Sequence, residues 1–310
     1  MFKKLVINKK ILFTFIVVLT LLGGYKMIFS NNSSNPVFNL MQKDNILEED
    51  LNGDKKKDTI VIKHTNQGII AQVNLNKNKT YSLDYSKELP TLGEYCPYWP
   101  IRISALDISR DNSKEIFLQS SFHNKPVQHI FTWDGSKYVN LFSSSDNILG
   151  FLDSSNSKTT KIVLGNYEGG DINFKGFIYN KGKLEEFTDT NPITLAGEDT
   201  ISSLISLVQT LPNQYLSVPN YFYPQISGSD LESLFRLANG SNSFKFQDGY
   251  FIDLAWQENG TITCANWILN FRATSTTNPS VISNLTVNLM INKYPDDDFP
   301  YKITSFNIYQ

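Results

Sequence analysis

Cysteine is scarce in this chain of 310 residues: only Cys96 and Cys264 are present. They lie in different predicted domains, so we expect small apolar core residues and not a disulfide framework. Histidine is almost as scarce, and none of the three forms a His-Glu-x-x-His zinc motif. The sequence also lacks a Gly-x-Ser-x-Gly nucleophile elbow and a phosphate-binding Gly-Lys-Ser/Thr loop. These absences argue against several common enzyme classes.

The chain has no large excess of charge of either sign, because the formal net charge is only −2 at pH 7. There is no basic footprint for nucleic acid, so we expect no nucleic-acid partner. The longest apolar run covers residues 11–29 and is interrupted once, at Lys26. Four lysines precede this run: Lys3, Lys4, Lys9 and Lys10.

That N-terminal pattern predicts a single transmembrane helix, because about 20 apolar residues span the hydrocarbon core. The lysines favour a cytoplasmic N-terminus, which places the bulk of the chain outside the cytoplasm. A cleaved signal peptide is the alternative interpretation. The predicted organisation is a cytoplasmic tail (1–10), a membrane anchor (11–29), a spacer (30–36), a repeat domain (37–188), a linker (189–199) and an α+β domain (200–310).

An acidic loop recurs in the repeat domain, each time directly before an apolar run. In the first copy, oxygen-bearing side chains occupy loop positions 1, 3, 5 and 9, which are Asp50, Asn52, Asp54 and Asp58. The second copy begins 57 residues later, with Asp107, Ser109, Asp111 and Glu115 at the same positions. A weaker third copy begins at Asp153. Such spacing lets one turn place several oxygen ligands around Ca²⁺. The alternative is a plain solvated turn rich in Asp and Asn.

The repeat is longer than the loop itself. In the second unit we expect four strands, at residues 101–108, 115–121, 127–133 and 137–142. Hairpin signals occur at similar offsets in the other units, near residues 76–83 and 179–187. Four strands in each repeat of roughly 40–50 residues is typical of a propeller blade. The sequence therefore predicts a propeller-like domain of about three four-stranded blades.

With its acidic loop between two strands, this part of the chain resembles the FG-GAP/VCBS-type repeats of bacterial surface proteins and integrin-like propellers. The resemblance covers about residues 36–188. It implies a structural and weakly bound Ca²⁺ at the first two loops. The sequence departs from the family pattern where Lys55 and Asn112 replace a glycine, and where Lys161 replaces the last acid of the third loop.

The C-terminal part combines two predicted helices with several strands. Residues 201–211 have apolar positions at helical spacing, and Ser229 with Glu232 predicts a capping box at the start of a second helix. Alternating strands follow, of which residues 285–291 are the clearest. This order predicts an α+β domain. It is similar to an NTF2-like or cystatin-like cone, which would hold a small molecule or form a dimer.

Two further groups of residues are candidates for a site. Tyr95, Tyr98 and Trp99 form an aromatic loop that could stack on sugars or peptides, or be buried. Among the carboxylates of the C-terminal part, Asp253 is the one we would expect to act as a base.

Together these patterns predict a membrane-anchored, extracytoplasmic scaffold that binds a protein or glycan partner without catalysis and is stiffened by calcium. The alternative is an envelope enzyme or small-ligand receptor that uses a pocket in the C-terminal α+β domain. A buried carboxylate in that domain would favour the alternative.

Overall fold

The computed structural model describes residues 46–75, 79–153, 158–187, 195–294 and 298–310. The predicted cytoplasmic tail, membrane anchor and spacer all lie outside these residues. Within the described ranges, no helix is both long and apolar enough to cross a membrane. The predicted transmembrane helix, residues 11–29, stays an expectation from the sequence.

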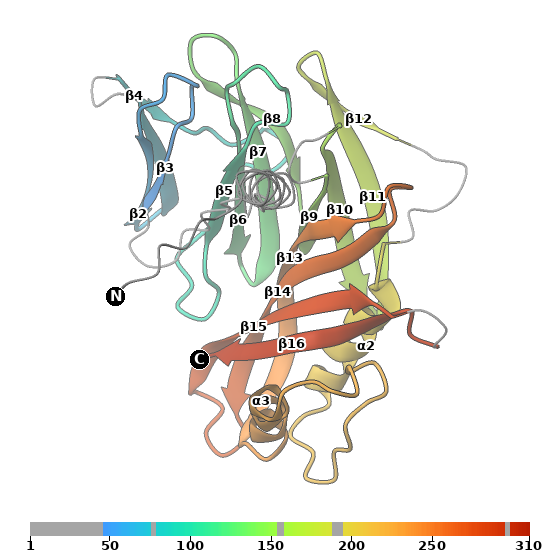
Figure 1. Cartoon of the computed structure of the whole chain (residues 1–310). Coiled ribbons are helices and arrows are strands. Elements are labelled where there is room, and N and C mark those ends of the chain that lie inside the picture. Colours follow the sequence, from blue (N-terminus) through green and yellow to red (C-terminus); the bar gives the residue numbers. More distant parts are fainter. Residues whose placement is uncertain (1–45, 76–78, 154–157, 188–194, 295–297) are drawn as a thin grey trace, which may run out of the picture. The chain divides into compact units, whose positions relative to one another are not determined.

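Two four-stranded antiparallel sheets come first along the chain (Figure 1). Sheet A contains β1 (Ile46–Glu49), β2 (Asp58–Thr65), β3 (Gly68–Leu75) and β4 (Lys79–Ser82), paired in that order. Sheet B contains β5 (Arg102–Leu106), β6 (Glu115–Phe122), β7 (Lys125–Trp133) and β8 (Tyr138–Ser144), also in order. Strands β6 and β7 are buried along most of their length, because both faces of sheet B are covered.

Sheet C has eight strands and joins the third repeat unit to the C-terminal part. Its order is β12-β11-β10-β9-β13-β14-β15-β16. The repeat contributes β9 (Ile148–Leu152), β10 (Lys161–Glu168), β11 (Asp171–Asn180) and β12 (Lys183–Glu186). The C-terminal part contributes β13 (Asn242–Trp256), β14 (Ile262–Ser275), β15 (Ile282–Lys293) and β16 (Tyr301–Tyr309).

The seam between these halves is the parallel pair β9–β13, where Gly150 lies opposite Phe251. A Cβ atom at Gly150 would lie 2.0 Å from the Phe251 ring. The absence of a side chain at Gly150 thus lets the aromatic ring pack directly over the seam.

The predicted propeller is wrong. The third repeat unit does not stand as a blade, because β9 pairs with β13 and the sheets remain open. For the same reason the C-terminal strands are not a separate, possibly NTF2-like cone. Local periodicity predicts strands and hairpins, but it carries no signal for an edge pairing between segments far apart in sequence. The predicted linker, residues 189–199, lies only partly within the described residues, so that domain boundary stays a prediction.

Two helices are present in the described part, α2 (Glu198–Gln209) and α3 (Gly228–Ala238). Helix α2 begins three residues earlier than expected, directly after Gly197, whose φ is +78°. Helix α3 is capped by Ser227, whose hydroxyl accepts a hydrogen bond from the Asp230 backbone N–H. The predicted cap Ser229 is therefore two residues too late, which is within the usual uncertainty of helix boundaries.

Apolar side chains fill three separate layers between these elements. The first lies between sheets A and B and includes Ile60 and Ile116. The second lies between sheet B and strands β9, β10 and β13, where the Phe117 and Phe151 rings meet edge to face. The third packs the two helices on sheet C around Trp267. Cys96 is half-buried, Cys264 is buried, and both are free thiols.

Candidate functional site: an acid-rimmed cavity beside helix α2

The first two acidic loops share one backbone path. In the first loop the Asp50 carboxylate accepts hydrogen bonds from the backbone N–H groups of Gly53 and Lys55, both at 2.8 Å. In the second, Asp107 accepts the equivalent bonds from Arg110 at 2.7 Å and Asn112 at 3.1 Å. Positions 4 and 6 have positive φ in both loops, Lys55 and Asn112 included. The repeated spacing therefore reflects a repeated local structure.

The remaining predicted ligands also contact the loop backbone. The side chains of Asn52 and Asp54 each accept a bond from the backbone N–H two residues ahead. In the second loop Asp111 accepts a bond from Ser113, and the Ser109 hydroxyl donates to Asp107. Each of these contacts is a local turn, of the kind that Asp and Asn favour.

Position 9 is different because its carboxylate is buried in both loops. Asp58 accepts a bond from the Leu51 N–H at 3.1 Å. Glu115 accepts bonds from the Ile108 N–H and the Thr132 hydroxyl, both at 3.0 Å. Burial raises the pKa of Glu115 to about 7 despite these donors. The nearby charge of Asp111 acts in the same direction.

No group of three or more metal-ligating His, Cys, Asp or Glu side chains is found among the described residues. Backbone N–H groups already bind the loop carboxylates, so the loops have a physical reason to fold as they do without an ion. The expectation of a calcium-binding protein thus gains no support from the structure. Calcium at these loops stays a prediction from the sequence pattern alone.

The aromatic loop is divided between surface and core. Trp99 is buried, Tyr98 stacks on the Arg272 guanidinium at 5.0 Å, and Tyr95 is 62% exposed. Asp253, which strand alternation places on the polar face, is buried, and its carboxylate accepts a hydrogen bond from the Asp153 N–H at 2.7 Å. Neither group assembles the site that the sequence suggested.

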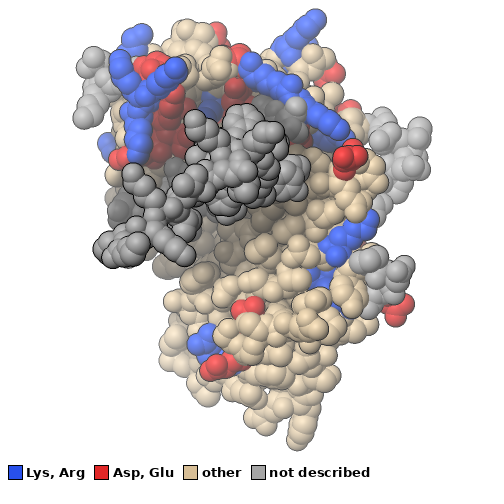
Figure 2. All heavy atoms as spheres, in the orientation of Figure 1, with Lys and Arg blue, Asp and Glu red and all other residues tan. Residues whose placement is uncertain are grey.

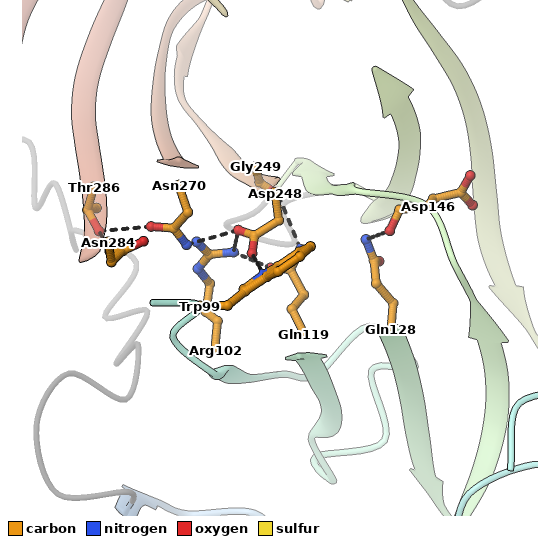
Figure 3. A network of polar contacts seen from close by, with 10 residues as sticks. All are labelled: Trp99, Arg102, Gln119, Gln128, Asp146, Asp248, Gly249, Asn270, Asn284 and Thr286. Atoms are coloured by element: carbon orange, nitrogen blue, oxygen red, sulfur yellow. Dashed lines mark hydrogen bonds and ion pairs between the residues drawn. The ribbon is translucent and has the colours of Figure 1, made fainter. Parts of the chain in front are cut away.

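A buried polar network connects sheet B to sheet C (Figure 3). The Arg102 guanidinium lies 3.0 Å from Asp248, and both side chains are nearly fully buried. The same carboxylate accepts hydrogen bonds from the Trp99 indole at 2.5 Å and the Asn270 amide at 3.0 Å. Gln119 accepts a bond from Arg102 and donates one to the Gly249 carbonyl. Each charge in this network therefore meets its counterpart inside the protein.

A cavity of about 760 Å³ opens where the third repeat meets the C-terminal part. It lies between the end of β9, the start of β11, the start of α2, the β13–β14 turn and the start of β16. Its apolar lining consists of Leu152, Ile172, Phe174, Leu195, Ile262, Pro300 and Tyr301. Its volume is in the range of small-molecule sites, which are concave and mainly apolar with a few polar groups.

The wall that carries α2 is fixed by short contacts to β16. The Thr200 hydroxyl donates to the Tyr301 carbonyl at 2.6 Å, and the Tyr301 hydroxyl donates to the Ile262 carbonyl at 2.6 Å. Gly197 lies against Ile291, because a Cβ atom there would come within 2.4 Å of the isoleucine side chain. The cavity is therefore bounded by packed elements, as a largely pre-formed site requires.

The cavity lining includes two carboxylates, and a third lies on a neighbouring strand. Glu198 and Asp199, in the first turn of α2, both line it, and Asp171 begins the adjacent strand β11. Burial raises the pKa of Glu198, and the charges of Asp199 and Asp171 raise it further. Within the described residues, no ion pair involves any of these three carboxylates. Residues 198 and 199 fall in the linker predicted from the sequence, although acids following a glycine are a known helix-start signal.

The surface charge is distributed unevenly. Figure 2 shows Asp and Glu gathered among Lys and Arg over the part that carries sheets A and B. In the same view, the part that carries β15, β16 and α3 is mainly uncharged.

Comparison with known proteins gives no further assignment. No protein-family model matches this chain, and no curated protein is similar to it at a significant level. The expected relation to FG-GAP/VCBS-type repeats therefore finds no support outside the loop pattern itself.

Proposed function

We propose that the protein is a non-enzymatic binding scaffold that takes up a small molecule in the cavity beside α2. The observation that carries this proposal is a cavity of about 760 Å³ whose lining combines apolar side chains with the carboxylates of Glu198 and Asp199. Apolar walls supply affinity in such sites, and a few convergent polar groups fix the orientation of the ligand. The small-ligand receptor, which was the alternative predicted from the sequence, is thus the better-supported form of binding.

The surroundings of the cavity support binding more than catalysis. General acid–base chemistry requires a base in hydrogen-bond reach of the reacting group and a residue that orients it. The three histidines lie on other parts of the fold, with His64 on β2, His123 in the β6–β7 turn and His129 on β7. His129 is buried and bonded to the Thr91 carbonyl, while burial lowers its pKa.

The location outside the cytoplasm belongs to the same proposal. It rests on the four N-terminal lysines and the apolar run after them, which lie outside the described residues. A protein or glycan partner at the surface of the scaffold also stays a prediction.

A neutral fluorescent probe tests the cavity directly. N-phenyl-1-naphthylamine should brighten on binding to the full chain, because its emission rises in apolar surroundings. Asn173→Trp, at an exposed position of β11 that lines the cavity, should abolish most of this increase. Lys175→Trp is the matched control, since it is exposed on the same strand face outside the lining. An equal signal from both variants, or no signal from the unaltered chain, would contradict the proposal.

A further inference from the structure

Strands β14, β15 and β16 of sheet C have one apolar and one polar face. The apolar face packs on the two helices and includes Trp267 and Val287. Residues that pair directly across neighbouring strands share a face, and Asn270 pairs with Thr286, which pairs with Tyr309. Alternation along each strand adds the other members of this polar face. We call it the amide face, after the asparagines Asn266, Asn270, Asn284, Asn288, Asn292 and Asn307.

Asparagine is an unusual residue for these positions. It is depleted in strands, because its side chain competes for backbone hydrogen bonds and favours turns. The core does not need it either, since apolar side chains such as Leu289 on the opposite face supply the contact with the helices. A group of residues that opposes local propensity is expected where a binding function selects them.

The hydrogen bonds of the amide face are incomplete within the described residues. Asn270 donates to the buried Asp248 carboxylate and accepts a hydrogen bond from Thr286 (Figure 3). Thr286 accepts one from the Asn284 amide nitrogen, while the buried oxygen of the same amide has no donor. Arg272, the cross-strand partner of Asn284, has a buried Nε–H without an acceptor. One acceptor and one donor on neighbouring strands therefore lack partners.

A hydroxyl group on a ligand matches these two unpaired atoms. It accepts a hydrogen bond from the Arg272 Nε–H and donates one to the Asn284 oxygen, so that both gain a partner. The two atoms are covered in the free protein, but each side chain as a whole is only half-buried, so a change of rotamer makes them accessible. Unpaired buried polar groups are rare, and these two therefore favour a hydroxylated ligand.

Two aromatic rings border the amide face. Tyr98, in the segment between β4 and β5, lies over Arg272, with the guanidinium 5.0 Å from the ring centroid. The Tyr98 hydroxyl donates to the Asn124 side chain at 3.1 Å, which fixes the ring. Tyr309, near the end of β16, is opposite Thr286 and 60% exposed. The face therefore combines planar amides with aromatic rings, in a part of the molecule that carries little charge (Figure 2).

Neutral glycans have the chemistry that this combination recognises. Each sugar hydroxyl both donates and accepts hydrogen bonds, and an asparagine amide answers with its nitrogen and its oxygen. The C–H faces of sugar rings pack on aromatic side chains, which offer apolar contact together with a polar tip. An extended peptide would instead pair with free backbone at a sheet edge, whereas the amide face presents side chains.

We propose that the amide face binds a neutral glycan, which crosses β14, β15 and β16 and stacks on Tyr309. Asn288 lies in the middle of the face, between Ile268 and Asn307, and its amide contacts the sugar hydroxyls. This surface is separate from the cavity beside α2, because none of its asparagines lines that cavity. The inference thus goes beyond the small-molecule site and chooses between the protein and glycan partners that the sequence leaves open.

Calorimetric titration of the full chain with hexasaccharides tests the ligand class. Cellohexaose, maltohexaose and the hexamer of N-acetylglucosamine are neutral, and hexagalacturonate carries carboxylates at the same length. At least one neutral hexasaccharide should bind, and hexagalacturonate should bind more weakly, because the face offers amides and not an array of cations. No heat from any neutral hexasaccharide up to its solubility limit, or tightest binding of hexagalacturonate, would overturn the inference.

Surface variants locate the glycan on the amide face. Tyr309→Ala and Asn288→Ala should each raise the dissociation constant about fivefold, through loss of the stacking ring or of the central amide. The controls are Tyr215→Ala, which removes a ring that is 94% exposed elsewhere, and Asn166→Ala, which removes a half-buried amide from β10. Because Tyr309 is exposed, Tyr309→Ala decides the outcome if Asn288→Ala melts early.

The same variants separate this inference from the proposed function. Tyr309→Ala and Asn288→Ala should keep the fluorescence increase of N-phenyl-1-naphthylamine, because neither residue lines the cavity. Unchanged glycan affinity in both variants would overturn the amide face as the glycan site and leave the cavity proposal as it stands.

A second copy of the chain is the alternative occupant of the amide face. Sedimentation velocity should give the same oligomeric state for the unaltered chain and for Tyr309→Ala. A dimer that Tyr309→Ala dissociates would overturn the inference, since protein and not glycan would then cover this face.

Discussion

Carboxylates in two regions of this molecule differ in how their negative charge is compensated. Asp248 is almost fully buried, and the Arg102 guanidinium compensates its charge at 3.0 Å. Glu198 and Asp199 lie at a cavity, where Asp171 adds a third negative charge and no described residue forms an ion pair with them. The charge of Asp248 is compensated within the protein, whereas the charges at the cavity are accessible to solvent or a ligand.

The difference separates a buried charge that a cation compensates from charges that solvent can reach. The Arg102–Asp248 pair joins sheet B to sheet C. Removing one partner of such a buried ion pair leaves an unpaired charge in the interior, which is costly. Carboxylates at the mouth of a cavity cost the fold little, because water can solvate them while the cavity is empty. We therefore expect large stability effects in the network and small ones at the cavity.

Breaking the network should have the largest effect. Arg102→Met should lower the free energy of unfolding by about 3–5 kcal/mol, because it leaves the Asp248 charge buried without its cation. Urea denaturation measures this change. Arg102→Met combined with Asp248→Leu should recover much of the loss, since both charges are then absent. If Arg102→Met alone were as stable as the parent, the buried pair would not differ from the cavity carboxylates in its contribution to stability.

Glu115 is buried like Asp248, but its carboxylate accepts hydrogen bonds from neutral donors and has no cation beside it among the described residues. Its pKa rises from 4.5 to about 7 in the folded state, so the folded protein binds a proton that the unfolded chain has released. Stability from this group is fully present below pH about 4.5 and is lost as the pH rises to about 7, by about 2–3 kcal/mol.

Urea titrations at several pH values measure this slope. Glu115→Gln should remove it, because the amide stays neutral over the whole range. Identical pH dependence in the variant and the parent would show that Glu115 ionises normally.

Gly197→Ala tests whether the cavity wall is rigid. The new methyl group would approach the Ile291 side chain to 2.4 Å at a φ of +78°, so we expect a loss of about 1–3 kcal/mol. Gly228→Ala, in α3, is the control because its new methyl group would meet no atom within 4 Å and alanine favours helices. Thermal melting compares the two, and equal melting temperatures would indicate a wall that yields.

Glu198→Gln should have the smallest effect on stability. The carboxylate is half-buried at the start of α2, where a first-turn acid contributes about 0.3–1 kcal/mol through the helix dipole. A stability loss as large as that of Arg102→Met would show that this carboxylate is structural.

Local features of this fold were readable from the sequence, and distant pairings were not. The spacing of Asp50 and Asp107 predicted two loops with one backbone path, because their hydrogen bonds are made within a few residues. The strands of sheet B were predicted close to their observed bounds for the same reason. In contrast, Trp99 and Asp248 are 149 residues apart, and nothing local marks either as a partner of the other.

The cavity shows the same limit. Its lining comes from five separate segments, so only the α2 start carried a readable signal in Gly197, Glu198 and Asp199. The propeller failed because strand periodicity leaves open which edges meet, and β9 meets β13. Asp248 and Asp253 are buried carboxylates in the C-terminal part, the feature that would favour the alternative function, but both face partners within the protein.

The most direct test of the cavity as a binding site maps the neutral probe onto the structure by backbone amide chemical shifts. N-phenyl-1-naphthylamine is titrated into the labelled full chain, and the shifts of residues 195–200 and 261–262 are compared with those of Arg102 and Asp248. We expect saturable changes at the cavity residues and none at the buried network. Changes that are absent from the cavity, or that centre on the network, would contradict the proposal that the cavity is the binding site.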